Sequence, residues 1–249
     1  MKLRCHLRRL RNLLGPDALH CIGDSHASFF GGEERMQPTW PRFSRDRIPR
    51  VRSYRIGPAL AYNLTKEGTA SRGRERLLEV LDTLPHGARV LLCFGEIDCR
   101  AHLAKQAARQ QLPLADVVAA CVARYLEAGA QVGARGFRVG YWQVPPPSLE
   151  NIPDGEFPIE GSFEERLAIT RGFNRLLAAG AMAQGQAFVS IFEKLTDAAG
   201  QPLPHYFLDG IHLSQQALPA ALAALRETWP ELDLPVMPLG NPASSISQS

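Results

Sequence analysis

Ser25 is the first residue whose type and setting could support covalent chemistry. It follows a short, mostly apolar run at residues 18–22 and the pair Gly23-Asp24. Such a run is typical of a strand covered on both faces, and a glycine after it permits a sharp turn. Asp24 and Ser25 also suit the first turn of a helix, so the tripeptide could be a simple helix cap. A serine at the carboxyl end of a strand would lie where open α/β sheets bind ligands.

An acid and a base that could serve this serine stand near the end of the chain. Asp209 and His212 are three positions apart, just before a stretch predicted to be helical from Ser214. One loop can hold both, with the carboxylate on one imidazole nitrogen and the other nitrogen facing a serine. Either residue could instead cap that helix. Together with Ser25, they predict a nucleophile, a general base and an orienting acid, a set that hydrolyses esters through an acyl-enzyme.

Alternating strands and helices must position these residues. Apolar runs predict strands at 18–22, 51–56, 88–94, 137–144 and 187–192. The stretches between and after them predict helices at 59–66, 73–84, 102–111, 115–128, 163–182 and 214–228. This alternation predicts an α/β fold, a single three-layer αβα domain around a five-stranded parallel sheet. The Pro- and Gly-rich segment 26–50 is predicted to be an ordered loop beside the site, and the Pro- and acid-rich segment 145–162 a loop at the same edge of the sheet.

The order of the motifs resembles the SGNH, or GDSL-type, hydrolase family. That family begins with a Gly-Asp-Ser and ends with an Asp-x-x-His, matched here by residues 23–25 and 209–212. It has a glycine after its second strand, matched by Gly57, and a Gly-x-Asn-Asp after the next, matched in part by residues 95–98. The resemblance spans roughly residues 17–230 and implies a flavodoxin-like SGNH hydrolase fold with an ester-hydrolysing activity.

The resemblance also implies a set of site residues. The catalytic triad would be Ser25, Asp209 and His212. The family's oxyanion donors are the serine N–H, the glycine N–H and the asparagine side chain, of which the first two map to Ser25 and Gly57. The asparagine position holds Ile97, which cannot donate, and losing one donor costs about 10²- to 10³-fold in rate. Arg100 could supply a charged donor instead. Further support would come from Asp24, Gly95, Glu96, Asp98 and His102.

The run from Gly95 to His102 resembles a variant third motif of SGNH-like proteins that act in polysaccharide and glycan modification. The expected substrate is therefore a small-molecule or glycan ester, first of all an O-acetylated sugar or glycan precursor, and no cofactor is expected. A structural role also fits this run, because Glu96 and Asp98 could cap helices or pair with Arg100 to brace the loop.

Three other functions fit parts of the pattern. A metal-assisted hydrolase would bind zinc or manganese through His205, Asp209 and His212 with Asp98 or Asp24. This hypothesis leaves Ser25 and the glycines unexplained. A non-catalytic carbohydrate-binding protein would use Trp142 and the aromatic and arginine side chains of residues 29–55. An O-acyltransferase could use the same triad.

Composition limits the remaining possibilities. The chain has 249 residues and a formal charge of only +3, which does not call for a nucleic-acid partner. Its five cysteines have no C-x-x-C spacing, and no apolar run approaches a membrane span, so a cytoplasmic location is expected. Residues 2–14 predict a basic amphipathic helix, either packed on the domain or in weak contact with a membrane surface. The predicted domains are an extension at 1–16, the hydrolase domain at 17–232 and a disordered tail at 233–249.

Overall fold

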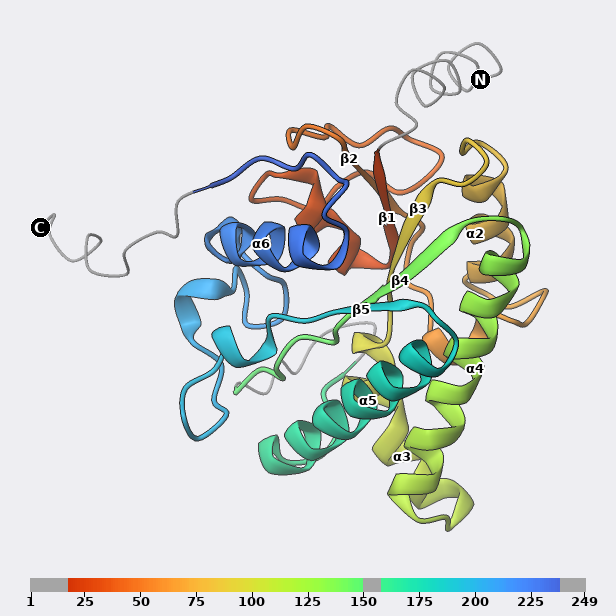
Figure 1. Cartoon of the computed structure of the whole chain (residues 1–249). Helices are drawn as coiled ribbons and strands as arrows, with labels where there is room; N and C mark the ends of the chain where they lie inside the picture. Colours follow the sequence, from red (N-terminus) through yellow and green to blue (C-terminus); the bar gives the residue numbers. More distant parts are fainter. Residues whose placement is uncertain (1–17, 150–157, 238–249) are drawn as a thin grey trace, which may run out of the picture.

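Five strands form one parallel sheet at the centre of the molecule (Figure 1). The computed structural model describes residues 18–149 and 158–237. The strands are β1 (Leu19–Gly23), β2 (Val51–Arg55), β3 (Arg89–Cys93), β4 (Arg138–Trp142) and β5 (Ala187–Val189). Their order across the sheet is β2-β1-β3-β4-β5, and all neighbours are parallel. The predicted α/β class and the flavodoxin-like five-stranded parallel sheet are confirmed.

Helices connect the strands. The α-helices are α2 (Gly73–Leu81), α3 (Leu103–Gln110), α4 (Leu114–Ala134), α5 (Phe163–Ala183) and α6 (Leu218–Thr228). The 3₁₀ turns are η1 (Ser25–Gly31), η2 (Ala61–Asn63), η4 (Phe192–Lys194), η5 (Pro204–Tyr206) and η6 (Gln215–Ala217), and η3 (Asp98–His102) is a π-helical turn. The helix predicted at 59–66 was wrong, because that segment forms only the single turn η2 after an extended Leu60.

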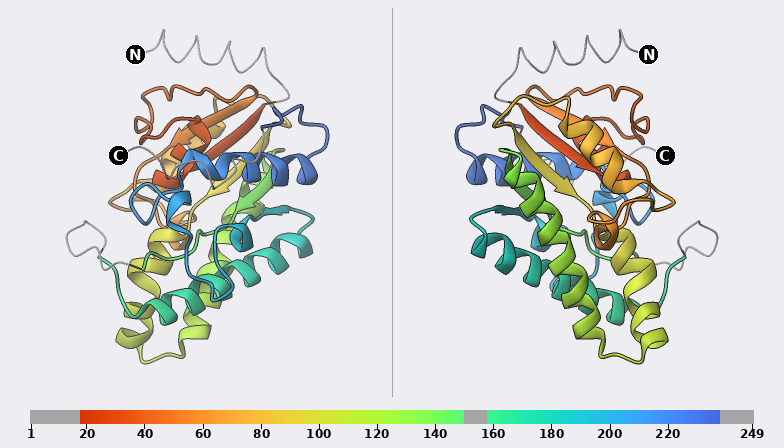
Figure 2. Two further views of the ribbon diagram at one scale, coloured as in Figure 1. Left: turned by 90° about the vertical axis from the view of Figure 1, so that its left-hand side faces the viewer. Right: turned by 90° about the vertical axis from the view of Figure 1, so that its right-hand side faces the viewer.

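Side chains of the strands divide between two apolar cores, one on each face of the sheet. On β3, Val90 and Leu92 face a core shared with α2, α4 and α5, whereas Leu91 and Cys93 face a core shared with η1 and α6. The views in Figure 2 show these helices on opposite sides of the sheet. The three predicted layers are therefore confirmed, and burial of both faces explains why the strands appear as nearly continuous apolar runs.

Aromatic side chains considered for sugar stacking are instead part of the core. Trp142 is 1% exposed, and its ring lies 5.1 Å from that of Phe30 and 6.2 Å from that of Phe29. Trp40 is also buried and donates its Nε1 hydrogen to Glu79. The suggestion that Trp142 and the aromatic side chains of Phe29, Phe30 and Trp40 bind sugar rings was therefore wrong.

Several predictions concern residues outside the described part of the chain. The extension at 1–16, with its basic helix at 2–14, lies there, as do residues 238–249 of the predicted tail. Within the described part, Leu234 is buried in the core that contains α6, so packing continues past the predicted boundary at residue 232. Among the described helices, none has the length and apolar character that crossing a membrane requires.

Candidate active site

Ser25 is positioned by the close approach of two strands. At Gly23, a Cβ atom would lie 2.2 Å from the carbonyl oxygen of Cys93, so only glycine fits at the end of β1. Asp24 then donates its backbone N–H to the same carbonyl, and its carboxylate accepts the backbone N–H of His26 at 2.9 Å. This cap starts η1 directly after the strand, as an N-cap aspartate is suited to do. Ser25 is consequently the first residue of η1, at the carboxyl edge of the sheet.

Asp209 and His212 belong to a tight turn between η5 and η6. The turn is closed by a hydrogen bond from the Leu208 N–H to the His212 carbonyl, 2.8 Å long. One oxygen of Asp209 accepts the backbone N–H groups of Ile211 and His212, at 3.1 and 2.8 Å. These bonds fix the carboxylate within the turn and leave its second oxygen for the imidazole.

Gln215 fastens this turn to the segment that carries the serine. Its side chain donates to the carbonyl of Phe29 at 2.9 Å, and its backbone N–H donates to the Glu34 carboxylate at 2.8 Å. Beneath these bonds, Leu213 and Ala217 pack in the same core as Phe29. Residues separated by nearly the whole domain are thereby held together at one sheet edge.

The three side chains form a continuous hydrogen-bonded chain. His212 Nε2 lies 2.8 Å from Ser25 Oγ, and His212 Nδ1 lies 2.7 Å from Asp209 Oδ2. Partial burial opposes ionisation of Asp209, but its hydrogen bonds from His212 hold the pKa of the carboxyl well below its usual range. Burial lowers the pKa of His212, outweighing the opposite effect of the Asp209 hydrogen bond. A neutral imidazole oriented by a carboxylate can accept the serine proton.

Glu96, Arg100 and His26 form a second group next to the triad. Glu96 accepts Arg100 Nε at 2.6 Å and Arg100 Nη2 at 3.2 Å, and its other neighbour is His26 Nε2 at 3.5 Å. The predicted bracing pair between Glu96 and Arg100 is therefore present. His26 was given no role by the sequence motifs, although a titratable residue directly after the nucleophile is a signal that could have identified it.

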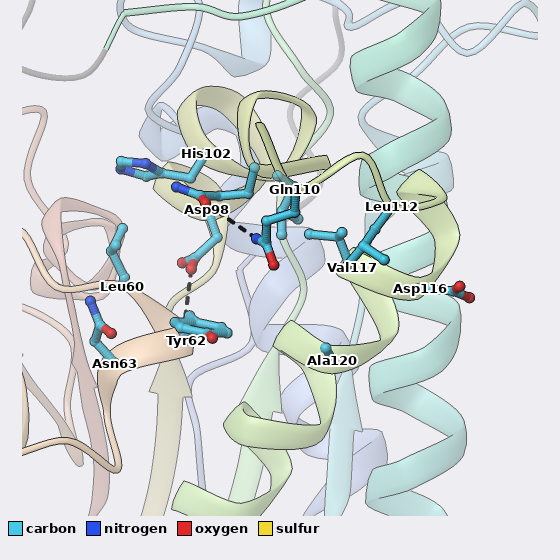
Figure 3. Close-up of a pocket in the computed structure, with 12 residues that line it drawn as sticks. Leu60, Tyr62, Asn63, Asp98, His102, Gln110, Leu112, Asp116, Val117 and Ala120 are labelled. Atoms are coloured by element: carbon cyan, nitrogen blue, oxygen red, sulfur yellow. Dashed lines mark hydrogen bonds between the residues drawn. The ribbon is translucent and has the colours of Figure 1, made fainter. Parts of the chain in front are cut away.

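Asp98 and His102 line a separate cavity of about 560 Å³ between η2, α3 and α4 (Figure 3). Asp98 is buried and accepts the backbone N–H groups of Ala61 and Tyr62, at 2.8 and 3.2 Å. Burial raises the pKa of Asp98 to about 6, against the effect of those two hydrogen bonds. Asp98 thus caps η2 and supports the segment after Gly57, which matches the capping role considered for it.

The glycine, isoleucine and buried aspartate of the predicted site lie on neighbouring strand ends. Gly57 follows β2 with a φ of +99°, and the N–H of Ile56 before it donates to the Gly23 carbonyl at 2.8 Å. The Ile97 side chain is buried and has no hydrogen-bond donor to offer an oxyanion. Asp24 is fully buried, and burial raises its pKa to about 7 despite the nearby His26. Gly95 forms the turn after β3 with a φ of +108°.

Two cavities adjoin the triad. A very small one, of about 10 Å³, is lined by Ser25, His26, His212 and Leu208 together with Glu33 and Arg35 of the loop after η1. A groove of about 390 Å³ has Leu208, Asp209, Phe207 and two prolines in its walls. The exposed residue Leu208 lines both spaces. Within the described ranges, no group of three or more His, Cys, Asp or Glu side chains is placed to hold a metal ion.

No family model matches the chain, and no curated protein matches it by sequence. Solved structures do match it. A Streptococcus pneumonia protein provisionally named a platelet activating factor is 21% identical, with a TM-score of 0.55 over 90% of this chain and 89% of that one. The inhibitor-bound M. Smegmatis aryl esterase is 19% identical (TM-score 0.51, 86% and 99% covered). A GDSL-like lipase from Bacteroides thetaiotaomicron is 12% identical (TM-score 0.50, 91% and 95% covered). At these identities the similarity shows a shared fold.

Proposed function

We propose that this chain, which has the SGNH (GDSL-type) hydrolase fold, is a serine esterase that removes a small acyl group from an oxygen ester. The observation that carries the proposal is the continuous contact from Asp209 through His212 to Ser25, with distances of 2.7 and 2.8 Å. An intact chain of this kind favours an enzyme over a binding protein that merely keeps the fold.

The reaction would proceed in two halves. His212 Nε2 takes the proton of Ser25 as the serine oxygen bonds to the ester carbonyl carbon, and then gives it to the departing alcohol oxygen as that C–O bond breaks. Water next adds to the acyl carbon after yielding a proton to His212, and Ser25 leaves with that proton. The backbone N–H groups of Ser25 and Gly57 would stabilise the oxyanion, with Arg100 as a third donor.

The space around the triad supports a small acyl group. The cavity at Ser25 has a volume of about 10 Å³, comparable with the space that one water molecule needs, which favours a short acyl group such as acetyl over a long chain. The groove of about 390 Å³ lined by Leu208 could take the larger alcohol. Its ring-bearing walls, Pro202, Pro204 and Phe207, next to the polar Asp209, suit the mixed surface of a sugar.

A chain-length series with p-nitrophenyl esters tests the activity and the acyl size together. We expect kcat/KM for the acetate to exceed that for the octanoate at least about tenfold, and Ser25→Ala to lose about 10⁶-fold in kcat. Leu208→Ala should raise the relative rate on longer esters, because it shortens an exposed side chain that lines both the cavity and the groove, at little cost to stability. Equal hydrolysis by wild type and Ser25→Ala would refute the serine route. A preference for octanoate would refute the small acyl group.

The alcohol is tested separately with O-acetylated sugars. Release of acetate from an O-acetylated hexose or oligosaccharide is expected to be faster than from ethyl acetate, because only the sugar fills the groove. The sugar assignment is wrong if both esters react with the same kcat/KM. Adding a second, unacetylated sugar separates hydrolysis from acyl transfer, since a transferase would form a new ester in place of free acetate.

A further inference from the structure

A second histidine lies against the base of the triad. His26 follows Ser25 in the chain, is 6% exposed, and has its ring centroid 5.0 Å from that of His212. The two ring planes are inclined by 32°. Because His26 is buried and the His212 side chain is only 20% exposed, water screens a charge on one ring incompletely from the other.

Two carboxylates lie close to His26. Glu96 lies 3.5 Å from His26 Nε2, and Asp24 accepts the backbone N–H of His26. Burial lowers the pKa of His26, but Glu96, together with Asp24 when it is ionised, outweighs this effect and raises the pKa above the usual value. Glu96 itself stays ionised: burial opposes this, yet His26 and Arg100 lower its pKa to about 2.

We propose that His26, anchored by the Glu96–Arg100 pair, keeps the ring of His212 in the neutral form that accepts the proton of Ser25. The proposal rests on the esterase function proposed above and adds a positioning residue to that site. The charged groups around His212 are Asp209 on Nδ1, the ring of His26 at 5.0 Å and Glu96 farther away, and Glu33 and Arg35 line the same small cavity. Burial does most to lower the pKa of His212, Asp209 and Glu96 raise it, and the cation of His26 adds to the effect of burial.

The consequence is an esterase that works in mildly acidic solution. Without His26, Asp209 and Glu96 would keep His212 protonated up to a higher pH than in the wild type. A protonated imidazole cannot act as a base. With His26 charged, the acid limb of the rate profile lies at lower pH. Above the pKa of His26 its charge disappears, but His212 is already neutral there, so the plateau of the profile is unaffected.

The pH dependence of kcat/KM for p-nitrophenyl acetate tests this role. His26→Gln removes the charge, and His26→Leu provides a second, apolar variant if glutamine disturbs folding. We expect the ratio of kcat/KM at pH 5.5 to that at pH 8 to fall roughly fivefold in either variant. His205→Gln is the control, because His205 is an exposed histidine whose ring packs on Tyr206, and its ratio should not change. An unchanged ratio in folded His26 variants would overturn the proposal.

A measurement that needs no turnover separates this inference from the esterase function. The imidazole protons of His212 can be titrated by NMR in a Ser25→Ala background, with their signals identified by loss in His212→Gln. Adding His26→Gln should move the titration midpoint of His212 to higher pH. A midpoint that stays in place would contradict the coupling. If the midpoint moves but no ester is hydrolysed, the proposed function fails and the influence of His26 on His212 stands.

Discussion

Replacing Asp209 by asparagine should disable the proton chain without disturbing the turn that carries it. The asparagine oxygen can keep the backbone N–H groups of Ile211 and His212, at 3.1 and 2.8 Å. Its amide group would then face His212 Nδ1 as a donor and force the imidazole proton onto Nε2. That nitrogen lies 2.8 Å from Ser25 Oγ and could no longer accept the serine proton.

The size of the effect depends on how much water reaches Asp209. In a serine protease triad with a buried aspartate, the same change lowers kcat about 10⁴-fold, or about 5.5 kcal/mol. Here the Asp209 side chain is 52% exposed, so solvent can partly replace the carboxylate at Nδ1. We therefore expect kcat for p-nitrophenyl acetate at pH 8 to fall about 10²- to 10³-fold, with KM nearly unchanged.

A matched control is available in the preceding loop. Asp197 also accepts two backbone N–H groups with one oxygen, from Ala199 and Gln201, both at 2.9 Å, and it is exposed. Asp197→Asn should therefore reproduce any effect on the turn itself while leaving kcat within twofold of wild type. If Asp209→Asn folds with an unchanged melting temperature and loses less than about tenfold in kcat, Asp209 does not orient the base and the reasoning fails.

Two other substitutions address groups around the triad. Burial raises the pKa of Asp24 to about 7, so between about pH 4 and pH 7 the folded protein keeps a proton that the unfolded chain has released. The free energy of unfolding therefore falls as the pH rises from 4 to 7. Asp24→Asn should therefore raise the melting temperature by about 3–6 °C at pH 8 and hardly at pH 4.5 in differential scanning fluorimetry, and equal shifts at both would contradict this explanation. Arg100→Ala should lower kcat about 10²-fold, since Ile97 offers no oxyanion donor. A kcat within threefold of wild type, in a folded variant, would remove Arg100 from the oxyanion hole.

The sheet was readable from the sequence because its strands are short, apolar and followed by turn residues. Each of the five predicted strands is present; the first is shifted by one residue, to 19–23, and the other four are shorter than predicted. The segment 59–66 could not be read in this way, because its single turn depends on Asp98, whose carboxylate accepts the N–H groups of Ala61 and Tyr62 from another part of the chain. A helix pattern over eight residues is too short to identify such a capped turn locally.

Trp142 illustrates the limit of composition arguments. An aromatic residue at the end of a strand near the site suits both ligand stacking and core packing, and the sequence does not choose between them. Packing in the core is decided by η1, which begins at Ser25 and places Phe29 and Phe30 against the indole ring of Trp142. The same turn therefore covers Trp142 and presents the serine.

Glu96 and Asp98 show which part of the site geometry could be inferred and which could not. Two residues apart at the start of a helix, their side chains must leave in different directions, because positions i and i+2 do not share a helix face. Only one of the two carboxylates can therefore point toward the triad. Which of them does so depends on the path of the chain after β3. Glu96 turns toward His26 and Asp98 toward η2. A single turn thereby supplies both the carboxylate that anchors His26 and the carboxylate that braces the segment after Gly57.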